Sequence, residues 1–156
     1  MTRLYGRAPT GERVIGTVPQ NYGQNVTILG AVGVQGVQAV MTVEGATDAE
    51  VFRTYVKRVL GPTRAPGDII VLDNLSAHKA SGVQQALARR RMRLLFLPPY
   101  SPDLSPMELY VSKLKTALRA AKARTREALE TAIRQALETV TAADARHWFK
   151  HCGYAL

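Results

Sequence analysis

The segment from residue 68 to residue 97 constrains the fold of this chain more than any other part of the sequence. Residues 68–72 and 94–97 are short apolar runs of the kind that form buried strands. Between them, residues 81–91 carry apolar side chains at helical spacing. A strand, a helix and a second strand in this order predict that the two strands pair in parallel. The fold class is therefore expected to be α/β.

The sequence predicts further strands and helices on both sides of this segment. Residues 25–34 and 37–43 are β-branched and apolar, and the turn-forming Gln35-Gly36 between them predicts a hairpin with largely buried strands. A capping box at residues 47–50 predicts the start of a helix. Later helices are expected at residues 106–123, 125–140 and from about 142. Together these elements predict a mixed sheet flanked by helices on both faces.

The composition limits the classes of protein that the chain can belong to. The 156 residues suffice for one compact domain without disulfide support. The single cysteine, Cys152, excludes an intramolecular disulfide and a cysteine-rich zinc site, which suits the cytoplasm. No apolar run approaches the roughly 20 residues that cross a bilayer, and no signal-peptide core follows Met1. We therefore expect a soluble protein with no membrane partner.

The charge of the chain favours an anionic partner. There are 21 lysine and arginine residues against 12 acidic residues, so the formal net charge is +9. Nucleic acid is the commonest partner of a basic soluble domain, because basic side chains that neutralise phosphates release condensed counterions. Solubility alone is the alternative explanation. The sequence has no phosphate-cradling glycine loop, paired-histidine zinc motif or nucleophile elbow, which argues against nucleoside-triphosphate and acyl-transfer chemistry.

Two acidic residues are the candidates for catalysis and metal binding. Asp73 directly follows the first of the two parallel strands, and ligands of open α/β sheets gather at the carboxyl ends of such strands. The alternative is that Asp73 only initiates a turn with Asn74. Glu108 lies at a predicted helix start, three residues after Ser105, so a capping box is its alternative role. One carboxylate can serve both a cap and a metal.

Basic residues follow Glu108 along the same predicted helix. At about 100° per residue, Lys115, Arg119 and Lys122 fall close to the direction of Glu108. Such a track suits a nucleic-acid backbone that lies across a metal site, with the cations placing phosphates rather than reading bases. A solvated helix face is an equal alternative.

A second group of basic residues follows Asp73. His78 and Lys79 are candidates for contact with a DNA phosphate, and their structural alternative is to cap the next helix. The run of arginines at residues 89–91, with Arg93, could also bind phosphate. That run lies at a helix end, where cations complement the helix dipole, and we prefer this structural interpretation.

Sequence motifs around the two acids occur in a fixed order. They are Ile70-Val71-Leu72-Asp73-Asn74, His78-Lys79, the stretch LFLPPYSPDL at residues 95–104, and a proline before Glu108. This combination resembles the bacterial insertion-sequence transposases of the mariner-like group. The 34 residues between Asp73 and Glu108 (74–107) match the interval between the second and third catalytic acids of that group. The similarity extends from Arg7 to Tyr154.

The resemblance implies a ribonuclease-H-like fold and a DDE active site. Two magnesium (or manganese) ions would lie between three carboxylates, two of them from Asp73 and Glu108, and would support DNA cleavage and strand transfer. DNA would be the substrate, and the protein would be cytoplasmic and associated with the nucleoid when bound to DNA. Residues 1–156 would form the C-terminal part of the catalytic domain. Its parts would be an extended basic arm (1–22), a core of sheet and helices (25–123) and C-terminal helices (125–156).

The sequence departs from the family pattern at its beginning. In the family, the first catalytic aspartate lies on a central first strand upstream of the arm, and a helix-turn-helix domain precedes it; neither is present here. We therefore expect weak metal binding, no independent activity, and association with the missing N-terminal half, a full-length transposase or a second copy. One alternative is a non-catalytic DNA-binding, assembly or inhibitory subunit of a full-length transposase. Another is a complete nuclease in which Glu44 or Asp48 is the third carboxylate.

Overall fold

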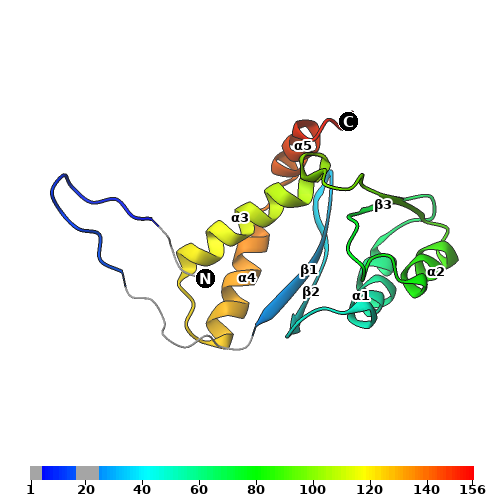
Figure 1. Ribbon diagram of the computed structural model, residues 1–156, viewed down its shortest axis with the longest axis horizontal. Helices are drawn as coiled ribbons and strands as arrows, with labels where there is room; N and C mark the ends of the chain where they lie inside the picture. Colours follow the sequence, from blue (N-terminus) through cyan, green and yellow to red (C-terminus); the bar gives the residue numbers. More distant parts are fainter. Residues whose placement is uncertain (1–4, 17–24) are drawn as a thin grey trace. The chain divides into compact units, whose positions relative to one another are not determined.

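The computed structural model describes residues 5–16 and 25–156, which divide into two compact units. The helical unit comprises Val111–Thr139 together with the described part of Met1–Gly23. The sheet unit comprises Gln24–Tyr110 and Val140–Leu156. All strands lie in the sheet unit (Figure 1), and so do both candidate acids.

The first sheet is a hairpin of β1 (Val26–Gly33) and β2 (Gly36–Glu44), paired antiparallel. Its turn begins one residue earlier than predicted, because Gly33 pairs with Gly36 and leaves Val34 and Gln35 as the loop. Gly36 has a φ of 106°, a conformation that glycine adopts without steric cost. The strands are half-buried rather than largely buried, which corrects the prediction from their apolar composition.

The second sheet consists of β3 (Ile69–Leu72) and β4 (Arg93–Phe96), which are joined through α2 (Ser81–Arg89). The two strands are parallel, as predicted, with Ile69 opposite Arg93 and Leu72 opposite Phe96. Half-buried and exposed positions alternate along both strands, so one face packs inward and the other is open. The predicted strand–helix–strand segment is therefore confirmed.

A helical segment between the two sheets begins at α1 (Ala49–Tyr55) and continues through the π-turn η1 (Val56–Leu60) and the 3₁₀ turn η2 (Gly61–Thr63). Asp48 is the N-cap: its Oδ1 accepts hydrogen bonds from the backbone N–H groups of Glu50 (2.9 Å) and Val51 (2.8 Å). The predicted capping box was therefore placed one residue too early. Asp48 has the extended backbone that an N-cap requires, and its carboxylate stabilises the positive end of the helix.

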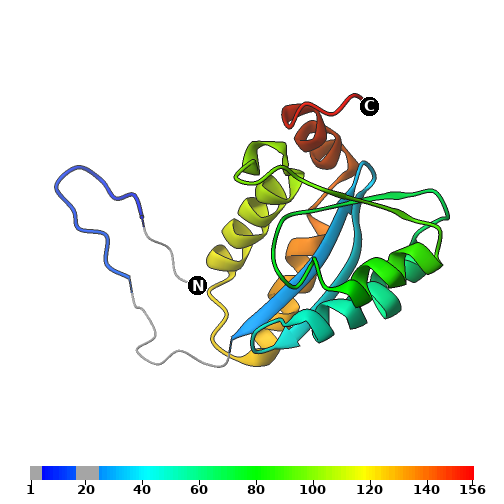
Figure 2. The ribbon, with the colours of Figure 1, turned by 45° about the vertical axis from the view of Figure 1, so that its right-hand side comes forward.

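The hydrophobic core of the sheet unit is formed mainly by side chains of the helical segment that begins at α1 and of α2. α1 and α2 lie side by side (Figure 2), and their buried side chains include Phe52, Tyr55, Val83 and Leu87. Residues of both sheets pack against this same cluster. Within the described ranges, each strand pairs with one neighbour only. The described residues thus form two short sheets that share one hydrophobic cluster with the helices.

α2 ends in a Schellman motif that has Arg91 at the position where glycine is usual. Arg91 N donates to Ala88 O (2.9 Å) and Met92 N donates to Leu87 O (3.1 Å), which is the hydrogen-bond pattern of a Schellman motif. Arg91 occupies the left-handed position with a φ of 58°. Glycine usually occupies this position, because a side chain there is sterically strained.

Arg91→Gly is therefore expected to stabilise the folded chain, by about 1 kcal/mol, since the left-handed backbone costs a non-glycine residue roughly 1–2 kcal/mol. Chemical denaturation of the purified chain followed by circular dichroism measures this difference. Arg89→Gly, a change inside the same helix, is the control and should destabilise by about 0.5–1 kcal/mol. Loss of stability in Arg91→Gly would show that the arginine side chain makes a favourable contact that outweighs the strain.

The C-terminal part of the sheet unit is the helix α5 (Ala142–His151). It begins with a capping box, in which Thr141 and Asp144 cap each other's backbone N–H groups. The helix contacts β2, and the backbone of Val140 and Thr141 lies within 4 Å of the position that a side chain on Gly36 would occupy. None of the helices in the described part of the chain is long and apolar enough to cross a membrane.

The helical unit is built from the continuation of α3 (Pro106–Ala121) and from α4 (Arg126–Glu138). Lys113 Nζ donates to Thr139 O (2.8 Å) and links the two helices. α3 ends two residues before the predicted boundary, because Lys122 adopts a left-handed φ of 49°. The described arm, residues 5–16, has no regular element, and the remainder of the predicted arm over 1–22 lies outside the described residues.

Candidate active site

Asp73 lies where β3 ends, at the carboxyl edge of the parallel pair. Its side chain is 53% exposed, and its Oδ1 accepts a hydrogen bond from Leu75 N (3.0 Å). This bond forms the Asp-initiated turn that was the structural alternative for Asp73. The turn uses only Oδ1, and Oδ2 has no protein partner among the described residues. The turn therefore holds the carboxylate in place and leaves one oxygen accessible.

His78 lies against the same carboxylate. Its Nδ1 is 2.6 Å from Asp73 Oδ1, an ion-pair contact when the imidazole is protonated, and Nδ1 makes no hydrogen bond in the described part of the protein. The imidazole packs against the Phe52 ring at a centroid distance of 4.2 Å, with the two rings tilted by 40°, and its side chain is only 16% exposed. This half-buried position favours contact with Asp73 over direct contact with a DNA phosphate.

The loop that carries Asp73 is fastened to the neighbouring strand by Asn74. Asn74 Nδ2 donates to Leu97 O (2.6 Å), and Leu97 N donates to Leu72 O (2.9 Å). The two bonds close the carboxyl ends of β3 and β4 against each other. Asn74 therefore belongs to the site as a positioning residue. The asparagine was visible in the sequence, but its long-range acceptor was not.

Glu108 lies in the first turn of α3, and its carboxylate is exposed. The described residues offer this carboxylate no ion pair or hydrogen bond. Glu108 N donates to Ser105 O (3.1 Å), so the bond at this helix start is between backbone groups. Within the described structure, the side-chain capping box that was the alternative role of Glu108 is not formed. The carboxylate is therefore available for a ligand.

The start of α3 is fixed by two tyrosines. Tyr110 is buried (1% exposed), its ring is 6.4 Å from that of Trp148 in an edge-on arrangement, and its hydroxyl lies beside Gly30 of β1. A Cβ on Gly30 would be 3.3 Å from this hydroxyl, so glycine permits the close approach. Tyr154 Oη donates to Leu104 O (2.9 Å) and holds the turn η3 (Pro102–Leu104) that precedes α3.

The Tyr110 hydroxyl is a buried polar group without a hydrogen-bond partner among the described residues, and burial raises the pKa of this phenol. Tyr110→Phe in the purified chain is expected to leave the free energy of unfolding unchanged or to raise it by up to about 1 kcal/mol, because the uncompensated desolvation of the hydroxyl is removed. Urea denaturation tests this, with Tyr154→Phe as the control that loses a formed bond. A loss above about 1 kcal/mol in Tyr110→Phe would contradict the absence of a partner.

The basic residues that are predicted to contact DNA lie in both units. Lys79 is exposed, and its ammonium lies 6.0 Å from the centroid of the Phe96 ring at the end of β4. Lys115 and Arg119 belong to the part of α3 in the helical unit, and Lys122 lies beyond the helix end. The helical projection that grouped Lys122 with Glu108 therefore does not hold. The DNA-contact role of these residues stays a prediction.

Among the described residues, no third carboxylate completes the site. The residues at 5–16 and 25–156 contain no group of three or more histidine, cysteine, aspartate or glutamate side chains that could hold a metal ion. Neither Glu44 nor Asp48 therefore joins Asp73 and Glu108, and Asp48 is occupied as the cap of α1. The hypothesis of a complete nuclease within this chain has no support in the described structure.

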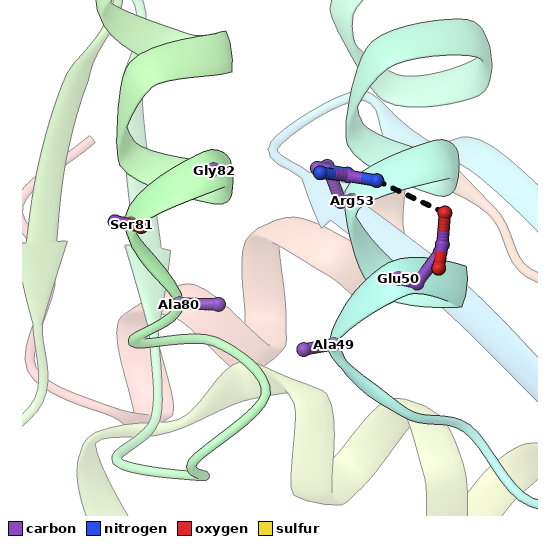
Figure 3. Close-up of a pocket in the computed structure, with 6 residues that line it drawn as sticks. All are labelled: Ala49, Glu50, Arg53, Ala80, Ser81 and Gly82. Carbon is purple, nitrogen blue, oxygen red and sulfur yellow. Dashed lines mark hydrogen bonds and ion pairs between the residues drawn. The ribbon is translucent and has the colours of Figure 1, made fainter.

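A shallow pocket lies away from both acids, where the first turns of α1 and α2 meet (Figure 3). Its volume of about 240 Å³ is below the roughly 300–1,000 Å³ of typical ligand pockets. The charged groups that line it, Glu50 and Arg53, pair with each other at 3.0 Å. Ala80, Ser81 and Gly82 contribute to the lining. The lining of this pocket therefore includes neither candidate acid and adds no free charged group to the candidate site.

Comparisons with known proteins agree with this fold. The sequence model of the family described as DDE superfamily endonuclease matches residues 1–130. The solved Mos1 strand transfer complex matches with a TM-score of 0.74 and 16% identity, over 97% of this chain and 47% of that chain. The Mos1 mariner paired end complex with Mn gives 0.70 and 17%, over 97% and 48%. The Mos1 transposase catalytic domain with Raltegravir and Mg gives 0.64 and 14%, over 83% and 76%.

The structural likeness confirms the predicted fold class, a ribonuclease-H-like α/β domain of the type found in transposase catalytic domains. Because the family model covers most of the sequence, the chain belongs to the DDE superfamily of endonucleases. The predicted DDE family is therefore confirmed at the level of the superfamily, and the fold is that of the Mos1 mariner transposase structures. The chain spans about half the length of the Mos1 transposases in the two DNA complexes. No curated protein shows a significant match.

Proposed function

We propose that this chain supplies Asp73 and Glu108 to the divalent-metal site of a DDE transposase that cleaves DNA and transfers the cut strand. The observation that supports this most directly is the pair of accessible carboxylates in one compact unit, one at a strand end and one at a helix start. Both acids also have the order and the separation of the second and third acids of this family. In this family, such acids would hold the metal ions that support cleavage and transfer of phosphodiester bonds in DNA.

The donor set fits magnesium or manganese. Both ions prefer oxygen ligands and keep several waters, so two carboxylates can contribute to such a site. Structures of the Mos1 catalytic domain have been solved with Mg and with Mn. When bound, these ions activate a water or a 3′-hydroxyl for in-line attack and neutralise charge on the phosphate, and the complete site would hold two of them.

The other residues of the site would hold these ligands and the DNA in place. Asn74 fixes the loop of Asp73 through Leu97, and His78 fills the space between that carboxylate and Phe52. Lys79 would contact a phosphate near the site. Lys115 and Arg119 on α3, and Lys122 just beyond its end, would contact the DNA backbone and position the duplex without reading its sequence.

The third acid would come from another polypeptide segment. Each strand of the two sheets has one partner within the described residues, and an extended segment that joined them would bury the unpaired backbone groups and the exposed face that includes Val71 and Leu95. We propose that this segment belongs to an N-terminal half of the catalytic domain or to a full-length transposase. Mos1 transposase has been solved in a paired-end complex with the left transposon end, and we propose that this chain also assembles on DNA, as a homodimer. Such an assembly would be associated with the nucleoid of a bacterial cytoplasm.

Metal binding and cleavage test this proposal separately. Calorimetry should detect weak Mn²⁺ binding by the purified chain, which Asp73→Asn and Glu108→Gln both remove. Nicking of supercoiled plasmid in Mg²⁺ should be absent for the chain alone and should appear when it is assembled with a segment that supplies the third acid. Mn²⁺ binding that survives both substitutions would overturn the assignment of the two acids. Robust nicking by the chain alone would overturn the need for another segment.

A further inference from the structure

Seven basic residues gather in two segments of the sheet unit that the proposed site does not use. We refer to them as the far-edge basic surface. Its members are Lys57, Arg58, Arg64, Arg89, Arg90, Arg91 and Arg93. The two segments, residues 57–64 and 89–93, contain no acidic residue. All members except Arg64 are exposed, and Arg64 is partly exposed.

Contacts between the two segments hold this surface together. Arg90 Nη2 donates to Lys57 O (3.4 Å), and the Arg90 guanidinium lies so close to Gly61 that a side chain there would clash at 2.6 Å. Backbone bonds join the connecting loop to the second segment: Gly67 N donates to Arg91 O and Arg93 N donates to Asp68 O, both at 2.9 Å. The cations are therefore neighbours in space as well as in sequence.

The surface lies at the opposite end of the parallel sheet from Asp73. Arg93 begins β4 and pairs with Ile69 at the start of β3, whereas Asp73 follows the end of β3. Four strand residues at about 3.3 Å each separate the two ends by roughly 13 Å. Cations at this distance do not contact the phosphate that the acids would process.

The dipole of α2 explains only part of this charge. Arg89 and Arg90 lie in the last turn or at the cap of the helix, where cations are favourable, and Arg90 also has the structural contact with Lys57. Arg91 and Arg93 lie beyond the helix end. Among the described residues, Asp68 is the one acid that pairs with this surface, through Arg64 at 3.8 Å.

Arg91 gives a second and independent indication of function. It occupies the left-handed position of a Schellman motif at a cost in stability, and the same motif at the end of α5 has glycine, Gly153, at this position. Strained residues persist where the surrounding structure fixes them, and they gather at functional sites. At the exposed end of α2, an arginine thus occupies a position where glycine would make the folded state more stable.

We propose that the far-edge basic surface binds the phosphate backbone of duplex DNA, without metal and independently of Asp73 and Glu108. The identity of the polyanion as DNA rests on the proposed function, and the contact itself rests on the charge and geometry of the surface. Arginine suits this role because its guanidinium can donate two parallel hydrogen bonds to a phosphate. With no acid between them, Arg89, Arg91 and Arg93 can each displace condensed counterions from the duplex.

The test measures binding of a fluorescent duplex of arbitrary sequence to the full chain by anisotropy, in EDTA and over a range of salt concentrations. The triple variant Arg89→Gln/Arg91→Gln/Arg93→Gln should weaken binding at least about 10-fold and reduce the slope of log K against log salt by roughly 2 to 3, at about 0.9 per phosphate contact. The charge-matched control is Arg134→Gln/Arg146→Gln/Lys150→Gln, three exposed cations of α4 and α5. It should change the slope by less than about 1.

Arg91→Gly separates a binding role from a structural one. It should weaken duplex binding and lower the salt slope by about 1, while the melting temperature stays the same or rises. Asp73→Asn/Glu108→Gln should bind the duplex at least as tightly as the wild type in EDTA. Equal weakening by both triple variants would overturn the proposal and leave the metal site unaffected. Failure of the wild-type chain to bind duplex would overturn it together with the DNA role of the chain.

Discussion

Asp73→Asn or Glu108→Gln is expected to lower metal-dependent DNA cleavage by the assembled transposase at least about 100-fold. Changes to groups that only support a metal ligand already cost roughly 10–100-fold in metal affinity or activity, and each of these substitutions removes a charged ligand itself. The amides keep the size of the side chains, and the amide oxygen introduced at position 73 could still accept the bond from Leu75 N, so the fold should be unchanged. Nicking of supercoiled plasmid at fixed Mg²⁺ measures the effect.

Asp68→Asn is the matched control for this experiment. Asp68 precedes the same strand, at its opposite end, and its carboxylate accepts from Ala65 N (3.1 Å), which an amide oxygen can replace. Cleavage should remain within about 3-fold of the wild type, because surface substitutions of this kind have small effects. If Asp68→Asn matched the loss seen in Asp73→Asn, the effect would be a general response to lost charge rather than loss of a ligand.

Phe52→Ala is expected to destabilise the chain by about 3–5 kcal/mol, the usual cost of removing a buried phenylalanine side chain. Phe52 is 4% exposed and belongs to the core cluster. Domains of this size are stable by about 5–15 kcal/mol, so the loss is a large fraction of the total. The same ring supports His78, and the ring-proton shifts of His78 should therefore move when the aromatic neighbour is lost.

Leu87→Ala distinguishes the two consequences of the Phe52 substitution. Leu87 is 1% exposed in the same cluster, so its removal should cost about 2–5 kcal/mol. The shifts of His78 should not change, because its aromatic partner is intact. Phe52→Leu should cost less than the alanine variant and should still move the shifts. Unchanged His78 shifts in both Phe52 variants would contradict the contact between the two rings. Urea denaturation and proton NMR provide the two measurements.

Local patterns were sufficient to predict most of the elements. Apolar runs with clear boundaries predicted β3 and β4, and their order predicted parallel pairing, which the register confirms. The predicted helix boundaries were less accurate than the strands, because a helix start or end depends on the backbone conformation of a single residue. The cap of α1 is Asp48 because that residue is extended, and the capping pattern that starts at Thr47 fits the sequence equally well. The end of α3 depends on the left-handed Lys122, which no propensity indicates.

The supports of the candidate site could not be predicted, because they join residues far apart in sequence. Asn74 reaches Leu97, and Tyr154 reaches Leu104 across 50 positions. The packing of His78 against Phe52 likewise depends on how α1 lies against the loop after β3. The acids themselves were proposed from their position and spacing, which are local. What holds each acid in place is a property of the tertiary structure.

Because hydrogen bonds join the ends of β3 and β4, a measurement at Leu97 can report on the position of Asp73. Asn74 donates to Leu97 O and Leu97 N donates to Leu72 O, so an opening that moves the end of β3 together with the acidic loop away from β4 releases the Leu97 amide. That amide becomes a reporter whose rate of exchange with solvent deuterium follows the fraction of molecules with a displaced loop. The position of Asp73 can thus be measured without an activity assay.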